Sequence, residues 1–132
     1  MPLPPTEALP LFTPEGERDW AEGWNPSFPA GDVDDTAPGT VFVTDAGDAH
    51  TVWVVADRTA SSMRYARITP GVWGGTVEVR CSEDGGGTVA EVTYDLTALS
   101  PTSEPGLQDF ADGFDDYMGE WEEAIAKAIS AR

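Results

Sequence analysis

The fold of this chain is decided by the stretch Ser103–Arg132, which reads SEPGLQDFADGFDDYMGEWEEAIAKAISAR. Apolar residues recur in it at steps of three and four, a spacing that places them on one stripe of an α-helix. This stripe consists of Leu107, Phe110, Phe114, Tyr117, Met118, Trp121, Ile125 and Ile129. We therefore expect one helix of roughly 40 Å opening at Ser103, although Gly113 and Gly119 each weaken it by about 1 kcal/mol. Such a stripe needs a wide apolar surface to cover.

Short strands supply such a surface, because alternating apolar and polar residues, separated by turn residues, precede the helix. The predicted strands are Gly39–Asp45, His50–Asp57, Ser62–Thr69, Trp73–Glu83 and Thr88–Ala98. Their close spacing predicts an antiparallel meander. The side chains expected to face inward are Val77, Val79 and Cys81 on the fourth strand, and Ala90, Val92, Tyr94 and Leu96 on the fifth. In the second strand both faces are apolar, so the pattern does not assign them.

The N-terminal part, before the strands, is rich in proline and carries little strand signal. A short helix is predicted at Thr6–Phe12, with Thr6 as its N-cap. A second helix is predicted to begin with Thr13 as its cap and a proline in its first turn, and to reach about Ala21. We expect residues 30–38 to form an exposed loop.

The composition bounds the class of protein. The length of 132 residues predicts a single domain over residues 1–132. With 24 acidic against 7 basic residues the net charge is −17, whereas binding nucleic acid or an anionic membrane surface requires a basic face. No apolar run approaches the roughly 20 residues that span a bilayer, so no membrane insertion is expected. A single cysteine and the lack of a signal peptide predict a cytoplasmic protein.

The expected elements follow one another as a pair of short helices, an antiparallel meander and a long terminal helix. In this order of elements and in several short sequence segments, the chain resembles the SRPBCC superfamily (START, Bet v 1-like and polyketide cyclase/dehydrase-like proteins). The resemblance is greatest to a bacterial branch of this superfamily. The similar segments are Leu11–Trp20, Gly23–Pro26, Gly39–Phe42, Thr51–Val55, Tyr65–Gly71 and Tyr94–Ser100. The resemblance implies an α+β helix-grip fold, in which a curved antiparallel sheet wraps around the C-terminal helix.

The chain departs from this superfamily at its start. Members usually begin with a strand that precedes the first helix and pairs with the last strand of the sheet, whereas here Met1–Pro5 leads directly into the first helix. The edge of Thr88–Ala98 is then open, and an open edge is a template for association. Either the start is truncated or a second subunit covers the edge, and we predict a homodimer through it.

The resemblance implies a cavity between the sheet and the C-terminal helix, and we expect it to bind a small hydrophobic or aromatic molecule such as a lipid or polyketide. Trp and Tyr suit such a pocket, since they combine apolar area with a polar tip. The expected lining residues are Trp53, Tyr65, Val77, Val79, Tyr94, Phe114, Met118 and Trp121. Arg67, in register with Tyr65, is the best candidate for a buried cation that holds a carboxylate or phenolate. The alternative for Arg67 is a surface position paired with an acid.

The residues leave two other functions open. A cyclase or dehydratase acting in the same cavity needs a general acid–base pair, and the available groups are His50, Tyr65, Tyr94 and Arg67. No motif assigns a catalytic role to any of them. A non-catalytic interaction protein would instead have a collapsed cavity and bind a partner through its sheet edge or its acidic face.

The remaining candidate sites favour structural roles. The acidic loop Asp32–Asp35 lacks the glycine and glutamate of an EF-hand. The helical acids Asp112, Asp115 and Asp116 lack the histidines of a di-metal carboxylate site. Cys81 is expected to be a buried thiol and His50 a surface hairpin residue. No metal and no cofactor are therefore expected.

Overall fold

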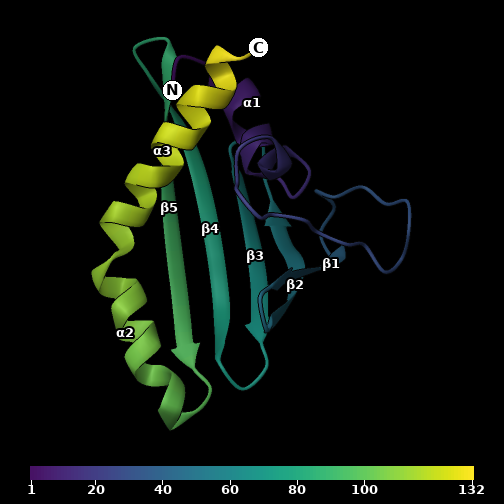
Figure 1. Ribbon diagram of the computed structural model, residues 1–132. Coiled ribbons are helices and arrows are strands. Elements are labelled where there is room, and N and C mark those ends of the chain that lie inside the picture. The colour runs from purple at the N-terminus through teal and green to yellow at the C-terminus, as the bar shows by residue number, and fades with distance from the viewer.

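The computed structural model describes residues 1–132 as an α+β structure with one five-stranded antiparallel sheet. The strands are β1 Val41–Ala46, β2 Ala49–Arg58, β3 Ser62–Thr69, β4 Trp73–Asp84 and β5 Gly87–Ala98. The helices are α1 Pro5–Ala8, α2 Glu104–Asp112 and α3 Phe114–Ser130, and the short 3-10 helices are η1 Leu9–Phe12, η2 Gly16–Asp19 and η3 Pro101–Ser103. Each strand pairs with the next along the chain, which confirms the predicted meander (Figure 1).

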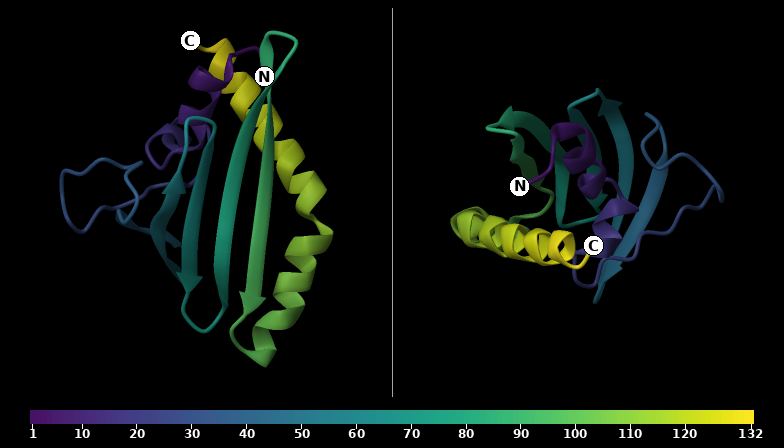
Figure 2. Two further views of the ribbon diagram at one scale, coloured as in Figure 1. Left: turned by 180° about the vertical axis from the view of Figure 1, so that it is seen from behind. Right: turned by 90° about the horizontal axis from the view of Figure 1, so that it is seen from above.

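The sheet is bent, and the helices lie on its open side. Seen from above, α3 crosses this side, and the N-terminal segment lies between α3 and the sheet (Figure 2). The connection from η2 to β1 projects beyond β1, at the edge opposite β5 (Figure 1). This arrangement is compatible with a helix-grip fold. None of the helices combines the length and the apolar character that crossing a membrane requires.

The concave face of the sheet carries the core and resolves the ambiguity of β2. Trp53 and Val55 are buried on this face together with Thr51, whereas Val52 and Val54 lie on the convex face. The inward residues expected on β4, Val77, Val79 and Cys81, are buried. Those expected on β5, Ala90, Val92, Tyr94 and Leu96, are half-buried. The predicted faces of both strands are therefore confirmed.

The N-terminal helices are shorter than predicted, and Thr6 is not a cap. α1 begins after Pro4, which makes no side-chain capping bond, and it runs directly into η1. The helix expected to reach about Ala21 is reduced to the single turn of η2. Proline supplies no backbone N–H, so a segment this rich in proline sustains only short helical turns.

The Thr13 hydroxyl explains why no regular helix starts at that residue. It donates a hydrogen bond to the Pro10 carbonyl at 2.8 Å and accepts one from the Gly16 N–H at 3.0 Å. These local bonds fix a tight turn in place of a helical start. Gly16 is needed in this turn, because a Cβ atom there would collide with the Pro10 carbonyl. The turn places η2, and with it Glu17, against the interior.

The C-terminal helix is broken, so the prediction of one continuous helix is wrong. Gly113, with φ −93° and ψ 7°, separates α2 from α3. Glycine has a low helix propensity, and the break lets the two helices contact different surfaces. On α2, the ring of Phe110 lies 5.2 Å from that of Tyr94 on β5, whereas on α3 the ring of Trp121 lies 5.1 Å from that of Trp20.

One edge of the sheet is formed by β5, which has no neighbouring strand on its outer side. At one end of this edge the Met1 ammonium group donates to the Thr88 carbonyl at 2.8 Å, and the Thr88 N–H donates to the Met1 carbonyl at 2.9 Å. Two residues that exchange both backbone bonds form an antiparallel pair. Beyond this pair the edge of β5 is open, as the sequence predicts.

Candidate functional site

A cavity of about 400 Å³ lies between the concave face of the sheet, the N-terminal segment and α3. The aromatic residues that line it are Phe12, Trp24, Phe42, Trp53, Tyr65, Trp73, Tyr94, Tyr117 and Trp121. The polar residues are Glu17, Glu22, Thr44, Asp45, Thr51, Arg67 and Thr69. This volume lies within the range of about 300–1,000 Å³ that small-molecule sites occupy. The interior is therefore not filled by side chains.

Arg67 is a cation without an acidic partner. β3 holds it on the concave face, where its guanidinium carbon lies 4.8 Å from the centre of the Trp53 ring. Its Nη2 donates to the Thr69 hydroxyl at 3.0 Å, but its Nε is buried and has no hydrogen-bond partner. Burial lowers the pKa of Arg67, although an ordinary arginine value is high enough that the group stays protonated. A buried donor without a partner is costly, so this site favours an added acceptor.

Glu17 brings an acid into the same cavity. The residue is half-buried, lines the cavity from η2 and forms no side-chain hydrogen bond or ion pair within the protein. Desolvation by burial raises the pKa of this carboxyl well above its usual value. Because burial disfavours the charged form, Glu17 is poised to hold a proton and to donate it in a hydrogen bond.

The tyrosines of the cavity differ in their bonding. The Tyr65 hydroxyl donates to the Phe12 carbonyl at 2.8 Å and so fastens the N-terminal segment to the sheet. Burial raises the pKa of Tyr65, with smaller contributions from Glu17 and Asp35. The Tyr94 hydroxyl makes no hydrogen bond within the protein, and burial, aided by Tyr117 and Glu17, raises its pKa as well. Tyr94 is thus a neutral hydroxyl that is free to bond a ligand.

The tryptophans form a fixed wall, since most of their indole N–H groups are already bonded. Trp53 stacks on Phe42 at 5.5 Å with an interplanar angle of 8°, and its Nε1 donates to the Thr44 hydroxyl at 2.9 Å. Trp24 donates to the Pro14 carbonyl at 2.8 Å. A wall held by stacking and hydrogen bonds offers apolar area with little loss of side-chain entropy on binding.

Most of the residues predicted to line the cavity do so. These are Trp53, Tyr65, Arg67, Val77, Val79, Tyr94 and Trp121. Phe114 and Met118 lie elsewhere, beside β5, where the Phe114 ring is 5.6 Å from that of Tyr94. The break at Gly113 accounts for the difference, because the stripe does not continue from α2 into α3 as one straight line. Tyr117 of α3 faces the cavity in their place.

The four candidate acid–base groups are not brought together as a set. Tyr65, Arg67 and Tyr94 line the cavity, whereas His50 does not. His50 lies on the β1–β2 hairpin with its Nδ1 2.6 Å from the Asp45 carboxylate, and 58% of its side chain is exposed. It is therefore a surface residue, as the sequence favours.

Cys81 and the acidic loop, the other candidate sites in the sequence, lie in surroundings that favour structural roles. Cys81 is buried on β4, and this burial raises the pKa of its thiol, which disfavours the reactive thiolate. In the acidic loop, Asp34 accepts hydrogen bonds from the Thr36 backbone and hydroxyl, which lower the pKa of Asp34. No group of three or more His, Cys, Asp or Glu side chains is arranged to hold a metal ion.

Several residues that line the cavity are not predicted from the sequence, among them Glu17, Trp73 and Tyr117. Glu17 follows a Thr-Pro-Glu segment, where acids are typical of an exposed first helical turn. Only the collapse of that predicted helix into η2 turns its side chain inward. Tyr117 belongs to the apolar stripe of the last helix. The pattern therefore predicts that its side chain faces other parts of the protein, but it does not predict which surface the side chain contacts.

Comparisons with known proteins give a fold relationship and nothing on function. No protein-family model matches the chain, and no curated protein sequence matches it. Among solved structures, protein MLL2253 from Mesorhizobium loti is similar, with a TM-score of 0.66 over 96% of this chain and 92% of that one. The two sequences are 14% identical, so the similarity is one of fold alone.

Proposed function

We propose that this protein binds a small hydrophobic or aromatic molecule carrying an anionic group, in the cavity between the sheet and α3. The observation that carries this proposal is Arg67, a half-buried guanidinium in an aromatic cavity, whose Nε is buried without a hydrogen-bond partner and which has no acidic partner. A carboxylate or phenolate accepts charge-assisted hydrogen bonds from such a group, and these are stronger than bonds between neutral partners.

The cavity also suggests how the rest of the ligand is held. The face of Trp53 and the aromatic residues around it suit the flat or apolar body of a lipid or polyketide-like molecule. Away from the anionic group, a carbonyl or hydroxyl oxygen would accept hydrogen bonds from protonated Glu17 and from Tyr94. The proposal therefore favours an amphipathic ligand with acceptors at two places over a simple hydrocarbon.

A thermal-shift screen tests this proposal with fatty acids and aromatic polyketide acids, each paired with its methyl ester or methyl ether. We expect the free acids to raise the melting temperature and the neutral analogues to raise it less. Substitution Arg67→Met should remove this preference for the acid, since it keeps an apolar side chain of similar length but deletes the cation. No shift from any of the compounds would contradict the proposal.

The matched control is Arg64→Met. Arg64 lies on the same strand as Arg67 but is exposed on the convex face, so its substitution should leave ligand preference unchanged. We also expect Arg67→Met to change the stability of the ligand-free protein by less than about 1 kcal/mol, because removal of the unpaired buried donor offsets the loss of the bond to Thr69 and of the contact with Trp53. The Thr69 hydroxyl is also bonded to the Thr51 hydroxyl at 2.6 Å, so it should keep one partner in this variant.

Glu17 favours a second candidate function, a cyclase or dehydratase acting in the same cavity. Such chemistry needs a group that holds a proton near neutral pH, and enclosure raises the pKa of Glu17 in that direction. The test is turnover of a polyketide-like substrate by the protein and by Glu17→Gln. A catalytic role predicts that Gln keeps ligand binding and loses turnover, whereas a binding protein shows no turnover in either form.

A further inference from the structure

The outer edge of β5 carries backbone groups that lack partners. In an antiparallel strand, successive residues direct their N–H and C=O groups to opposite sides. Leu99 bonds Val72 on the β4 side, whereas Thr88 bonds Met1 on the outer side, so the even-numbered residues of β5 face outward. Those beyond Thr88 are Ala90, Val92, Tyr94, Leu96 and Ala98. No helix, loop or turn supplies a hydrogen bond to them.

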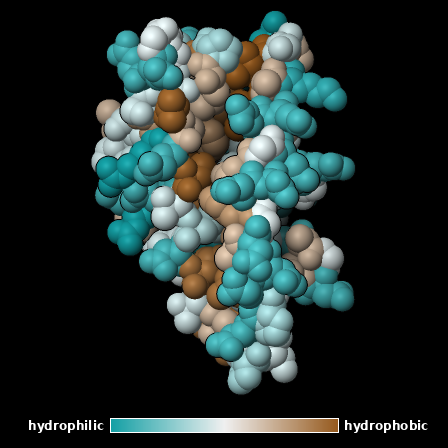
Figure 3. Space-filling model, turned by 90° about the vertical axis from the view of Figure 1, so that its left-hand side faces the viewer, coloured by the Kyte–Doolittle hydropathy of each residue, from teal (hydrophilic) through white to brown (hydrophobic).

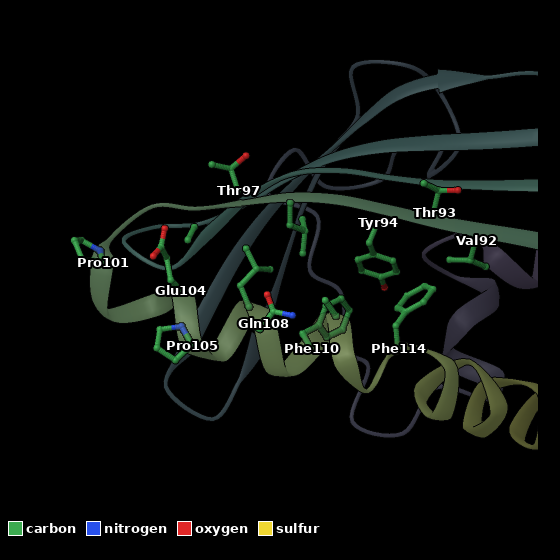
Figure 4. A pocket seen from close by; sticks show the side chains of 14 residues that line it. Val92, Thr93, Tyr94, Thr97, Pro101, Glu104, Pro105, Gln108, Phe110 and Phe114 are labelled. Atoms are coloured by element: carbon green, nitrogen blue, oxygen red, sulfur yellow. The ribbon is translucent and has the colours of Figure 1, made fainter.

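An apolar groove runs along this edge, between β5 on one side and α2 and α3 on the other. Its two parts, which we call the β5 groove, have volumes of about 1010 and 540 Å³. The helical side chains that line it include Leu107, Phe110, Phe114, Met118, Ile125 and Ile129. Figure 3 shows this face as a band of apolar residues between hydrophilic flanks. In Figure 4, Tyr94 points from β5 towards Phe110 and Phe114.

The helical wall of the groove is incompletely covered by the protein itself. No residue of α2 is buried, although Leu107 and Phe110 belong to the apolar stripe that directs this helix towards the sheet. A stable helix in a globular protein usually buries such a stripe. One wall of the β5 groove therefore carries backbone N–H and C=O groups without hydrogen-bond partners, and the other wall carries exposed apolar surface.

The charges around the groove favour a positively charged occupant. No lysine or arginine lines either part of it, whereas Glu104 and Glu122 do. Glu91 and Asp95 are exposed on the convex face of β5, next to the position of an added strand. Opposite charges on neighbouring strands attract each other, and the whole chain carries a net charge of −17.

We propose that the β5 groove binds an extended basic peptide segment of another protein, which extends the five-stranded sheet by one strand. The peptide runs antiparallel to β5, as Met1 does where it pairs with Thr88, with its C-terminal end towards Met1. Its apolar side chains face α2 and α3, and its lysine or arginine side chains face Glu91 and Asp95. This is β-strand addition, in which backbone bonds give affinity and alternate side chains give specificity.

A peptide segment fits this geometry better than a second copy of the chain. A symmetric antiparallel pairing of two β5 strands has its two-fold axis perpendicular to the sheet, so both copies of α2 would lie on the same side of one seam. Each copy also brings the same acids, Glu91 and Asp95, to that seam. Like charges on neighbouring strands destabilise the pairing. The homodimer expected from the sequence remains a prediction, and in the following test it is a contrary outcome.

The test uses a synthetic nine-residue peptide of alternating valine and lysine, with two matched controls. In the first control, the valine–lysine peptide carries N-methyl groups on those backbone nitrogens that would donate hydrogen bonds to β5. In the second control, glutamate replaces lysine. Fluorescence polarisation should show the parent peptide binding at least tenfold more tightly than either control. In hydrogen exchange, the amides of Ala90, Val92, Tyr94 and Leu96 should become protected, while those of Glu91 and Thr93, already bonded to β4, should not change.

A groove-filling variant tests the location independently. Ala111 is exposed and lines the groove from α2, so Ala111→Trp should weaken peptide binding at least tenfold without disturbing the core. Equal binding of the parent and N-methylated peptides would overturn the proposal. So would a dimer, detected by light scattering, whose β5 amides are protected in the absence of peptide. Neither result bears on ligand binding in the central cavity, which Arg67→Met tests separately.

Discussion

At the scale of single residues, Arg67 and Glu17 both line the central cavity, where their charged forms are less stable than in water. Arg67 keeps its charge, because an arginine holds its proton even when burial lowers its pKa. Glu17 resolves the same problem by favouring the neutral acid. No ion pair joins the two. The cavity thus presents a permanent cation, Arg67, and a carboxyl, Glu17, whose burial favours its neutral form.

Glu17 is expected to make stability fall as pH rises. In the folded protein its pKa lies well above the value of the unfolded chain, so between the two pKa values the folded state binds the extra proton. Below both values the carboxyl is protonated in both states and costs nothing. Between them, the stability of Glu17→Gln relative to the native chain should rise by about 1.4 kcal/mol per pH unit. Urea unfolding of both proteins from pH 4 to pH 8 measures this difference, and a constant difference would refute it.

At the scale of elements, the sequence predicts the sheet better than the segments on either side of it. The sequence predicts both ends of the strand Ser62–Thr69, because its residues alternate in polarity from Ser62 and the Pro70–Gly71 pair stops the strand after Thr69. The N-terminal turns depend on one hydroxyl, that of Thr13, which bonds locally in a way that helix-capping rules do not anticipate. Composition indicates that Gly113 weakens the helix, but tertiary contacts of α2 and α3 decide that it breaks there.

The side chains of the site differ in how far the sequence predicts their positions. Residues on strands, such as Trp53, Arg67 and Val77, were placed correctly because the period of two fixes their face. Phe114 and Met118 were misplaced because the pattern defines a stripe on a helix without fixing where the helix lies on the sheet. The inward position of Glu17 is not predictable from the sequence, since it follows from the irregular turn before η2.

Tyr65 provides one of the hydrogen bonds that hold the N-terminal segment on the sheet. We expect Tyr65→Phe to reduce the free energy of unfolding by about 1–3 kcal/mol, because it leaves the buried Phe12 carbonyl without its bond of 2.8 Å. Urea unfolding measures the loss. The control is Tyr117→Phe, which removes a hydroxyl that makes no hydrogen bond within the protein and should change stability little. Equal effects of the two substitutions would show that the bond does not hold the segment.

At the scale of the whole molecule, the surface is dominated by charge of one sign. There are 24 acidic and 7 basic residues, and only two arginine–carboxylate pairs lie in contact, Arg18 with Glu15 and Arg80 with Glu78. A net charge this far from zero destabilises a compact state through repulsion, and salt screens that repulsion. The structure therefore tolerates its charge best in a medium of high ionic strength.

Raising sodium chloride from 20 to 500 mM at pH 7 should increase the melting temperature by about 3 °C, which corresponds to about 1 kcal/mol in a chain of this length. Differential scanning calorimetry measures the shift. The control is the same pair of salt concentrations near pH 4.1, the isoelectric point of the sequence, where the repulsion vanishes and the shift should disappear. An equal rise at both pH values would indicate a general effect of salt and contradict this account.

The pairing of Met1 with Thr88 has a practical consequence for anyone who produces this protein. Residues fused ahead of Met1 continue in the direction that this pair sets, which carries an affinity tag or a cleavage remnant along the edge of β5. Such a leader would compete with the peptide added in the assay and mask its binding. Expression plasmids should therefore place the tag after Arg132, which is exposed beyond the C-terminal end of α3 and makes no bond to β5.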